Sequence, residues 1–180
     1  DPLSKAAVKR LATFDEASNP DGSADLHFVE LAVRDIARSL KNKKERHEVV
    51  IKSTVTPTTT TNVIKPLLER ESGKTVNDGI GLIMNPEFLR EGTAVYDTEH
   101  PHLIVIGSNE SKSADILESF YNDIYGRNLP EIIRTTPASA ELIKYANNSF
   151  LATKISFINT IANICQNVPG TDVKTIAYAI

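Results

Sequence analysis

The sequence predicts an α/β fold in which a parallel sheet with crossover helices is followed by one long helix. The first observation is that short apolar runs alternate with stretches whose apolar residues recur at helical spacing, a pattern typical of βα units. The second is that no glycine or proline interrupts the chain between Pro137 and Pro169. We therefore expect one helix of about 30 residues there, much longer than the average of about 11 to 12.

The first part of the chain predicts a turn, a helix, a strand and a second helix. Proline and glycine within residues 19–22 indicate the turn, and Asp25 can cap a helix whose apolar residues recur up to Leu40. The apolar run at residues 49–51 predicts a buried strand. A second helix that passes through Leu68 completes one βα unit.

Three more strands and one more helix are predicted before the long helix, and one helix is predicted after it. Apolar runs predict strands at residues 80–84 and 103–106 and a short one at 132–133, with a helix near 111–125. Asp172 can cap a last helix that continues to the end of the sequence.

Directly after the strand at residues 80–84, the sequence predicts a single helical turn. Asn85 suits the N-cap of that turn, Pro86 suits its first position, and Gly92 suits the residue past its end.

Polar side chains follow two of the predicted strands. Glu87 and Glu91 lie four residues apart and so share one face of the turn, while Ser53 and Thr54 follow the strand at residues 49–51. In open α/β sheets, ligands bind beyond the carboxyl ends of the strands, so these side chains are candidates for a binding site. The alternative is that the glutamates are solvated and the hydroxyls form a turn or a helix cap.

The long helix carries a polar stripe that includes Glu141, Lys144 and Asn148. Lys144 and Asn148 lie one turn apart and could jointly donate hydrogen bonds to an oxygen that becomes negative during a reaction. The alternative is an ordinary solvated face. Cys165 lies among isoleucines, which favours a small buried apolar side chain over a nucleophile.

The bulk composition favours a folded protein that binds a small molecule. With 180 residues and 41% hydrophobic side chains the chain can bury a core, and a net charge of -3 gives no basic surface for nucleic acid. No apolar stretch reaches the roughly 20 residues that a membrane helix needs. The single cysteine and the lack of Cys/His clusters predict a reducing cytoplasm and no metal site.

Four segments, in this order, together resemble the UDP-glucose/GDP-mannose dehydrogenase family. They are IKSTV at residues 51–55, NPEFLREG at 85–92, LIVIG at 103–107 and AELIKYANN at 140–148. The resemblance extends from about Ser18 to Ile180. The long helix looks most similar to UDP-glucose dehydrogenases, with GDP-mannose dehydrogenases next.

The resemblance implies a fold, a cofactor and a reaction. Residues 1–136 would form part of a Rossmann-like NAD-binding domain, and residues 137–180 the central helix and the start of the substrate region, with the helix forming a homodimer. The family uses NAD to oxidise the C6 alcohol of a sugar nucleotide twice, through an enzyme thioester. The implied substrate is UDP-glucose, and the product UDP-glucuronate would serve polysaccharide synthesis. The alternative substrate is GDP-mannose.

The resemblance also implies a role for each matching residue. Ser53, Thr54 and Val55 would border NAD, and Thr54 would also help to hold the catalytic water. Lys144 and Asn148 would bind the oxygen at C6 and stabilise its charge. Glu87 would act as the acid and base in hydrolysis, with Glu91 nearer the nicotinamide. The segment that would line the substrate consists of Glu87, Phe88, Leu89, Arg90 and Glu91.

Three departures from the family pattern lead us to expect a fragment that is inactive alone. The sequence contains no GxGxxG fingerprint, and the cysteine nucleophile of the family would lie beyond the long helix. A strand expected between Ala17 and Ser18 is missing, so residues are predicted to be absent at that point. The rival interpretation is a non-catalytic dimerisation or binding module that retains the scaffold.

Overall fold

The computed structural model describes residues 24–180, which fall into two compact units. The first unit extends to Lys144 and the second runs from Tyr145 to Ile180. The predicted turn at residues 19–22 and the predicted gap between Ala17 and Ser18 lie outside the described residues. The first unit contains all four strands, and its α/β architecture confirms the predicted fold class.

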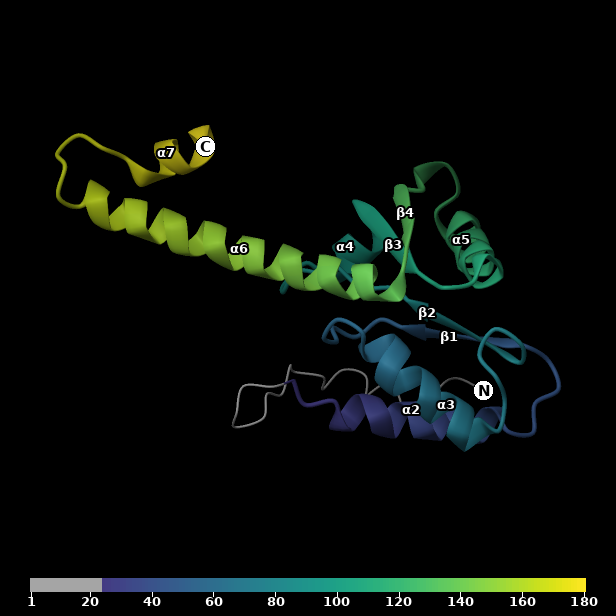
Figure 1. The fold of residues 1–180 in the computed structure, drawn as a ribbon. Coiled ribbons are helices and arrows are strands. Elements are labelled where there is room, and N and C mark those ends of the chain that lie inside the picture. The colour runs from purple at the N-terminus through teal and green to yellow at the C-terminus, as the bar shows by residue number, and fades with distance from the viewer. Residues whose placement is uncertain (1–23) are drawn as a thin grey trace. The chain divides into compact units, whose positions relative to one another are not determined.

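The first unit is built on a four-stranded sheet in the order β1-β2-β3-β4 (Figure 1). The strands are β1 (His47–Ile51), β2 (Ile80–Met84), β3 (Leu103–Gly107) and β4 (Glu131–Thr135). Strand β1 runs parallel to β2, and β3 runs parallel to β4, in both cases over the full five residues.

The two inner strands meet in a way that the sequence did not predict. Strands β2 and β3 pair antiparallel, with Met84 opposite Gly107. A parallel crossover usually contains an α-helix that packs back on the sheet, whereas the segment between these strands carries only the short helix α4 (Ala94–Glu99). The chain reverses, so the carboxyl ends of β2 and β3 lie next to each other.

Helices cover both faces of this sheet. Helices α2 (His27–Leu40) and α3 (Lys65–Ser72) pack side by side on one face, where Leu82 and Met84 contribute to the core (Figure 1). Helix α5 (Ser111–Tyr125) packs with Ile83 in a second core cluster. This division follows from the pleat, because successive side chains of a strand point to opposite faces. Each fully buried Leu or Ile contributes roughly 1.5–3 kcal/mol.

The predicted cap at Asp172 is confirmed, whereas the N-cap of α2 is Leu26, one residue after the predicted Asp25. The Asp25 carboxylate accepts a hydrogen bond from the His27 amide at 2.8 Å, at the start of α2. Asp172 accepts hydrogen bonds from the amides of Lys174 and Thr175 at 3.2 and 3.0 Å and begins α7 (Val173–Ala179). The helix expected after β1 begins with a π-helical turn, η1 (Thr60–Ile64), which continues into α3.

The predicted long helix forms one continuous element, α6 (Pro137–Cys165, 29 residues), which follows a 3-10 turn η2 (Gly126–Asn128) and strand β4. Its first two turns belong to the first unit and bury Ala140, Glu141 and Lys144. A Cβ at Gly107 would lie 2.6 Å from the Cβ of Ala140. Glycine at that position therefore lets the helix approach the end of β3.

The predicted helical turn at residues 85–92 is wrong. Residues 85–90 are irregular, and the helix begins only at Ala94. The Asn85 side chain is not available as a cap because its Oδ1, the atom that would accept from a helix amide, accepts from the Lys52 Nζ and the Tyr121 hydroxyl, while its Nδ2 donates to the carbonyl oxygen of Val105 at 2.7 Å. Gly92 has a φ of +83° and lies in the turn that precedes α4 instead of ending a helix.

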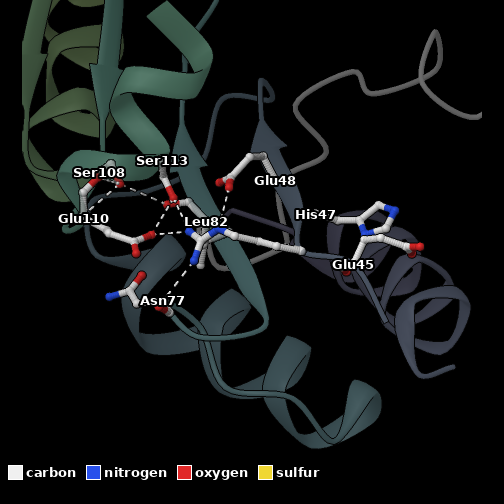
Figure 2. A network of polar contacts seen from close by, with 9 residues as sticks. Glu45, His47, Glu48, Asn77, Leu82, Ser108, Glu110 and Ser113 are labelled. Carbon is white, nitrogen blue, oxygen red and sulfur yellow. Dashed lines mark hydrogen bonds and ion pairs between the residues drawn. The ribbon is translucent and has the colours of Figure 1, made fainter. Parts of the chain in front are cut away.

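A polar network ties the amino-terminal ends of β1 and β2 to α5 (Figure 2). Arg46 donates to Glu48 at 2.8 Å and to the Ser113 hydroxyl at 2.9 Å, and it also pairs with Glu110. A Cβ at Gly81 would lie 1.4 Å from a Glu48 carboxylate oxygen and 2.4 Å from the Ser113 hydroxyl. The network therefore fits only against a residue without a side chain.

The second unit contains the rest of α6 and the short helix α7. In this unit, Phe150 and Phe157 of α6 are 65% and 54% exposed. Cys165 is a free thiol and only partly buried, so the prediction of a buried side chain is wrong. Among the described residues, no helix combines the length and apolar character needed to cross a membrane.

Candidate active site at the carboxyl ends of the strands

The first turns of α6 contact the segments that follow three different strands. Ala140 packs against the end of β3, Glu141 binds the loop after β1, and Lys144 binds the segment after β2. All of these contacts lie within the first unit. Because ligands of α/β sheets bind beyond the carboxyl ends of strands, this is the candidate site.

Glu87 and Lys144 form an ion pair at the centre of this site. The Lys144 Nζ lies 2.9 Å from the Glu87 Oε1, with the Lys144 side chain 6% and the Glu87 side chain 30% exposed. The other Glu87 oxygen accepts a hydrogen bond from the Leu89 amide at 2.6 Å. The Lys144 Nζ also lies 5.7 Å from the centre of the Phe88 ring. A nearly buried ammonium group is thus fixed beside a carboxylate that still reaches solvent.

A second polar cluster, in which Asn85 and Tyr121 are buried, was not predicted. The Asn85 Oδ1 accepts hydrogen bonds from the Lys52 Nζ at 2.9 Å and from the Tyr121 hydroxyl. Burial lowers the pKa of Lys52, and the negative charge of Glu87 raises it by a smaller amount. Burial likewise raises the pKa of Tyr121. The signal in the sequence was a lysine and an asparagine at the exits of neighbouring strands.

Glu141 is another site residue, and no role was predicted for it. It is fully buried, and its two oxygens accept hydrogen bonds from the Thr58 and Thr60 amides at 2.5 and 2.7 Å. Glu141 and Lys144 therefore do not lie on a solvated face of the helix, which was the alternative interpretation of the polar stripe.

The loop after β1 is close to the expected position but only part of it can face a ligand. Ser53 and Thr54 are partly buried directly beyond the carboxyl end of β1. The Val55 side chain is 1% exposed and belongs to the core cluster. Any contact of Val55 with a cofactor would therefore have to use its backbone.

The side chains of the three residues after Phe88 lie at the surface. Leu89 and Glu91 are exposed. Arg90 is held by Asp97, to whose carboxylate it donates from Nη2 at 2.6 Å and from Nε at 3.1 Å. The side-chain hydrogen bond from Arg90 holds the pKa of Asp97 well below its ordinary value.

Asn148 is partly buried and follows Lys144 by one turn of α6, but it belongs to the second unit. The position of Asn148 is therefore given relative to the other residues of the second unit. Among residues 24–180, no group of three His, Cys, Asp or Glu side chains is placed to hold a metal ion.

Two protein-family models together match nearly the whole chain. Residues 15–125 match the NAD binding domain of the UDP-glucose/GDP-mannose dehydrogenase family, and residues 138–180 match its central domain. The chain belongs to the UDP-glucose/GDP-mannose dehydrogenase family. The fold of the first unit is therefore Rossmann-like as well as α/β.

Individual relatives include dehydrogenases of both substrate types. The chain is 44% identical over 164 residues to a UDP-glucose 6-dehydrogenase of Haloferax volcanii, covering 91% of this chain and 38% of the relative. The structure of a GDP-mannose dehydrogenase from Pseudomonas aeruginosa superposes with a TM-score of 0.83 at 39% identity, over 92% of this chain and 37% of that one.

A UDP-glucose dehydrogenase from Pyrobaculum islandicum gives a TM-score of 0.80 at 38% identity, over 91% of this chain and 36% of that one. The chain thus spans well under half of the length of these relatives.

Proposed function

We propose that this chain supplies the NAD-side loop and the central helix of a nucleotide-sugar dehydrogenase that oxidises UDP-glucose to UDP-glucuronate. The observation that carries the proposal is the Glu87–Lys144 ion pair at the carboxyl ends of the strands. Membership of the family supports the reaction class. The chain would act as part of a protein that also provides the cysteine nucleophile of the family.

The loop after β1 fits the proposed cofactor. Ser53 and Thr54 offer two hydroxyl groups beyond the end of a buried strand, where dinucleotides bind in Rossmann-like sheets. NAD, when bound, would accept the hydride from the C6 carbon. Ser53 and Thr54, with the backbone of Val55, would hold the cofactor on the side of β1, and Thr54 would also orient the water used in hydrolysis.

Lys144 is the proposed donor to the C6 oxygen. An alcohol that loses hydride must also lose its proton, so negative charge develops on this oxygen. A cation that is already fixed and largely desolvated stabilises such charge more effectively than a mobile one. Lys144 meets both conditions, because its side chain is 6% exposed and held by Glu87. Asn148 would provide a second donor from the same helix.

Glu87 is the proposed acid and base. One of its oxygens is bound to Lys144 and the other to the Leu89 amide, which fixes the carboxylate within reach of a substrate bound at Lys144. Removal of a general acid or base costs about 10²–10⁴-fold in rate. Glu91 is the proposed residue nearer the nicotinamide, and Phe88, Leu89 and Arg90 are proposed to line the substrate.

GDP-mannose is the second candidate substrate, favoured by the TM-score of 0.83 with a GDP-mannose dehydrogenase. The complete gene product, incubated with NAD and either nucleotide sugar, should produce NADH with UDP-glucose at a kcat/KM well above that with GDP-mannose. The reverse preference would replace UDP-glucose by GDP-mannose. NADH formation with neither sugar would overturn both candidate substrates and favour the rival interpretation, a non-catalytic binding module.

The second unit is the proposed dimer interface. Its helix exposes large apolar side chains, among them Phe150 and Phe157, as expected of a surface that pairs with a second copy. The proposed protein is a homodimer that pairs through α6. Its proposed location is the cytoplasm, and its proposed role is in polysaccharide synthesis. Mass measurement of the complete gene product should give a dimer, and Phe150→Asp should weaken it.

A further inference from the structure

Glu141 is a buried titratable group that the proposed reaction does not use. Its side chain is fully buried, and it accepts hydrogen bonds from the backbone amides of Thr58 and Thr60. Burial of a carboxylate is unfavourable unless hydrogen bonds and an opposite charge or dipole compensate it. Here the two amides lie at the start of the helical segment η1 and α3, whose dipole favours a negative charge.

The loop that Glu141 binds has a strained backbone. Thr58 has a φ of +76°, a conformation that is unfavourable for a β-branched residue. Such a residue persists only where its surroundings hold it. The Glu141 carboxylate binds the Thr58 amide directly, and the Thr56 and Thr59 hydroxyls lie 2.9 Å apart beside it. Glu141 is therefore the anchor of the loop that begins with Ser53 and Thr54.

The same helix turn carries Lys144. Glu141 and Lys144 are three residues apart, share the buried side of α6, and bind the segments after β1 and after β2 respectively. The Glu141 carboxylate thus sets the position of the loop after β1 relative to the ammonium group of Lys144.

We propose that Glu141 is a positioning residue that holds the Ser53–Thr59 loop in the conformation that binds NAD. This inference rests on the proposed function of Ser53 and Thr54 in cofactor binding. It predicts that loss of the Glu141 carboxylate weakens NAD binding more than it slows the turnover of bound substrate, because Glu87 and Lys144 remain paired.

The test is Glu141→Gln in the complete gene product. Glutamine keeps the size of the side chain but replaces one accepting oxygen with an NH₂ group, which faces an amide that also donates. Hydrogen bonds to charged groups are worth about 1.5–3 kcal/mol, so the dissociation constant of NAD, measured by calorimetry, should rise about tenfold or more. The kcat at saturating NAD should change by less than about threefold, since the Glu87–Lys144 pair that acts in the transition state is retained.

Glu69→Gln is the matched control. Glu69 is also a carboxylate that holds a backbone amide, accepting from Val76 at 2.9 Å, but it lies on α3 away from the site. Hydrogen exchange at the Thr58 and Thr60 amides should accelerate about tenfold or more in Glu141→Gln and remain unchanged in Glu69→Gln.

The possible outcomes separate this inference from the proposed function. Accelerated exchange with unchanged NAD affinity would make Glu141 a purely structural residue and overturn the inference. Unchanged exchange would overturn it as well. If the unsubstituted protein bound NAD but oxidised no nucleotide sugar, the proposed function would fail, while the NAD dissociation constants would still decide the role of Glu141. If the unsubstituted protein did not bind NAD, both would fail.

Discussion

Replacement of Asn85 by leucine should destabilise the first unit strongly, although the two side chains are similar in size. Asn85 is 1% exposed and lies between β2 and β3. Its amide satisfies three groups, namely the Val105 carbonyl, the Lys52 ammonium group and the Tyr121 hydroxyl. Leucine satisfies none of them.

The expected loss of unfolding free energy follows from the hydrogen bond that each of the three groups loses. Val105 is fully buried, so its carbonyl would be left without a partner at a cost of about 1–3 kcal/mol. The Lys52 ammonium group and the Tyr121 hydroxyl lie 3.3 Å apart and keep a bond to each other, so each should lose about 1 kcal/mol. Apolar burial of leucine offsets part of this loss. The free energy of unfolding should therefore fall by roughly 2–4 kcal/mol.

Urea unfolding followed by circular dichroism measures this difference. With a urea dependence of about 2 kcal/mol per molar, the midpoint should fall by roughly 1–2 M. Asn62→Leu is the control, because Asn62 is exposed and the same substitution there should leave the midpoint nearly unchanged. If both variants unfolded at the midpoint of the unsubstituted protein, the Asn85 cluster would contribute nothing to stability, and the reasoning from buried polar groups would be refuted.

Two other substitutions test separate parts of the fold. Gly81→Ala would place a methyl group against the Glu48 carboxylate and the Ser113 hydroxyl. The melting temperature should therefore fall by an amount equivalent to about 1–3 kcal/mol or more. An unchanged melting temperature would contradict the close packing at Gly81. Asp97→Asn should melt below the unsubstituted protein at neutral pH. Because Arg90 lowers the pKa of Asp97 from 3.8 in the folded state, the stability that it contributes is present above pH 3.8 and is lost as the pH falls further. The difference in melting temperature should close with acidification, and a gap that stayed constant with pH would count against the ion pair.

The local elements of this protein could be predicted from the sequence because their signals are local. The lack of helix breakers predicted α6, and the Asp172 cap predicted the start of α7. The pairing direction of β2 and β3 could not be predicted in this way. It depends on how the segment between the strands packs, and apolar periodicity is the same for a parallel and an antiparallel strand.

The candidate site shows the same division. Glu87 and Lys144 were identified from position and resemblance, and the structure brings them together. Asn85 was assigned to a helix cap because asparagine is common there, but its capping oxygen accepts hydrogen bonds from Lys52 and Tyr121, which are distant in the sequence. Glu141 had no predicted role because its partners are backbone amides more than eighty residues away. A partner of that kind leaves no pattern in the side chains of the sequence.

A double-mutant cycle on Glu87 and Lys144 tests the central claim most directly. In the complete gene product, Lys144→Met and Glu87→Gln should each lower kcat for NADH formation by about 10²–10³-fold, and Lys44→Met, at an exposed position before β1, should have no effect. If the two groups act as a pair, the double variant should lose little more than either single variant. Losses that multiply would show that the two groups act independently and not as a pair, and full activity of Lys144→Met would show that its ammonium group has no part in the reaction; either result would contradict the account.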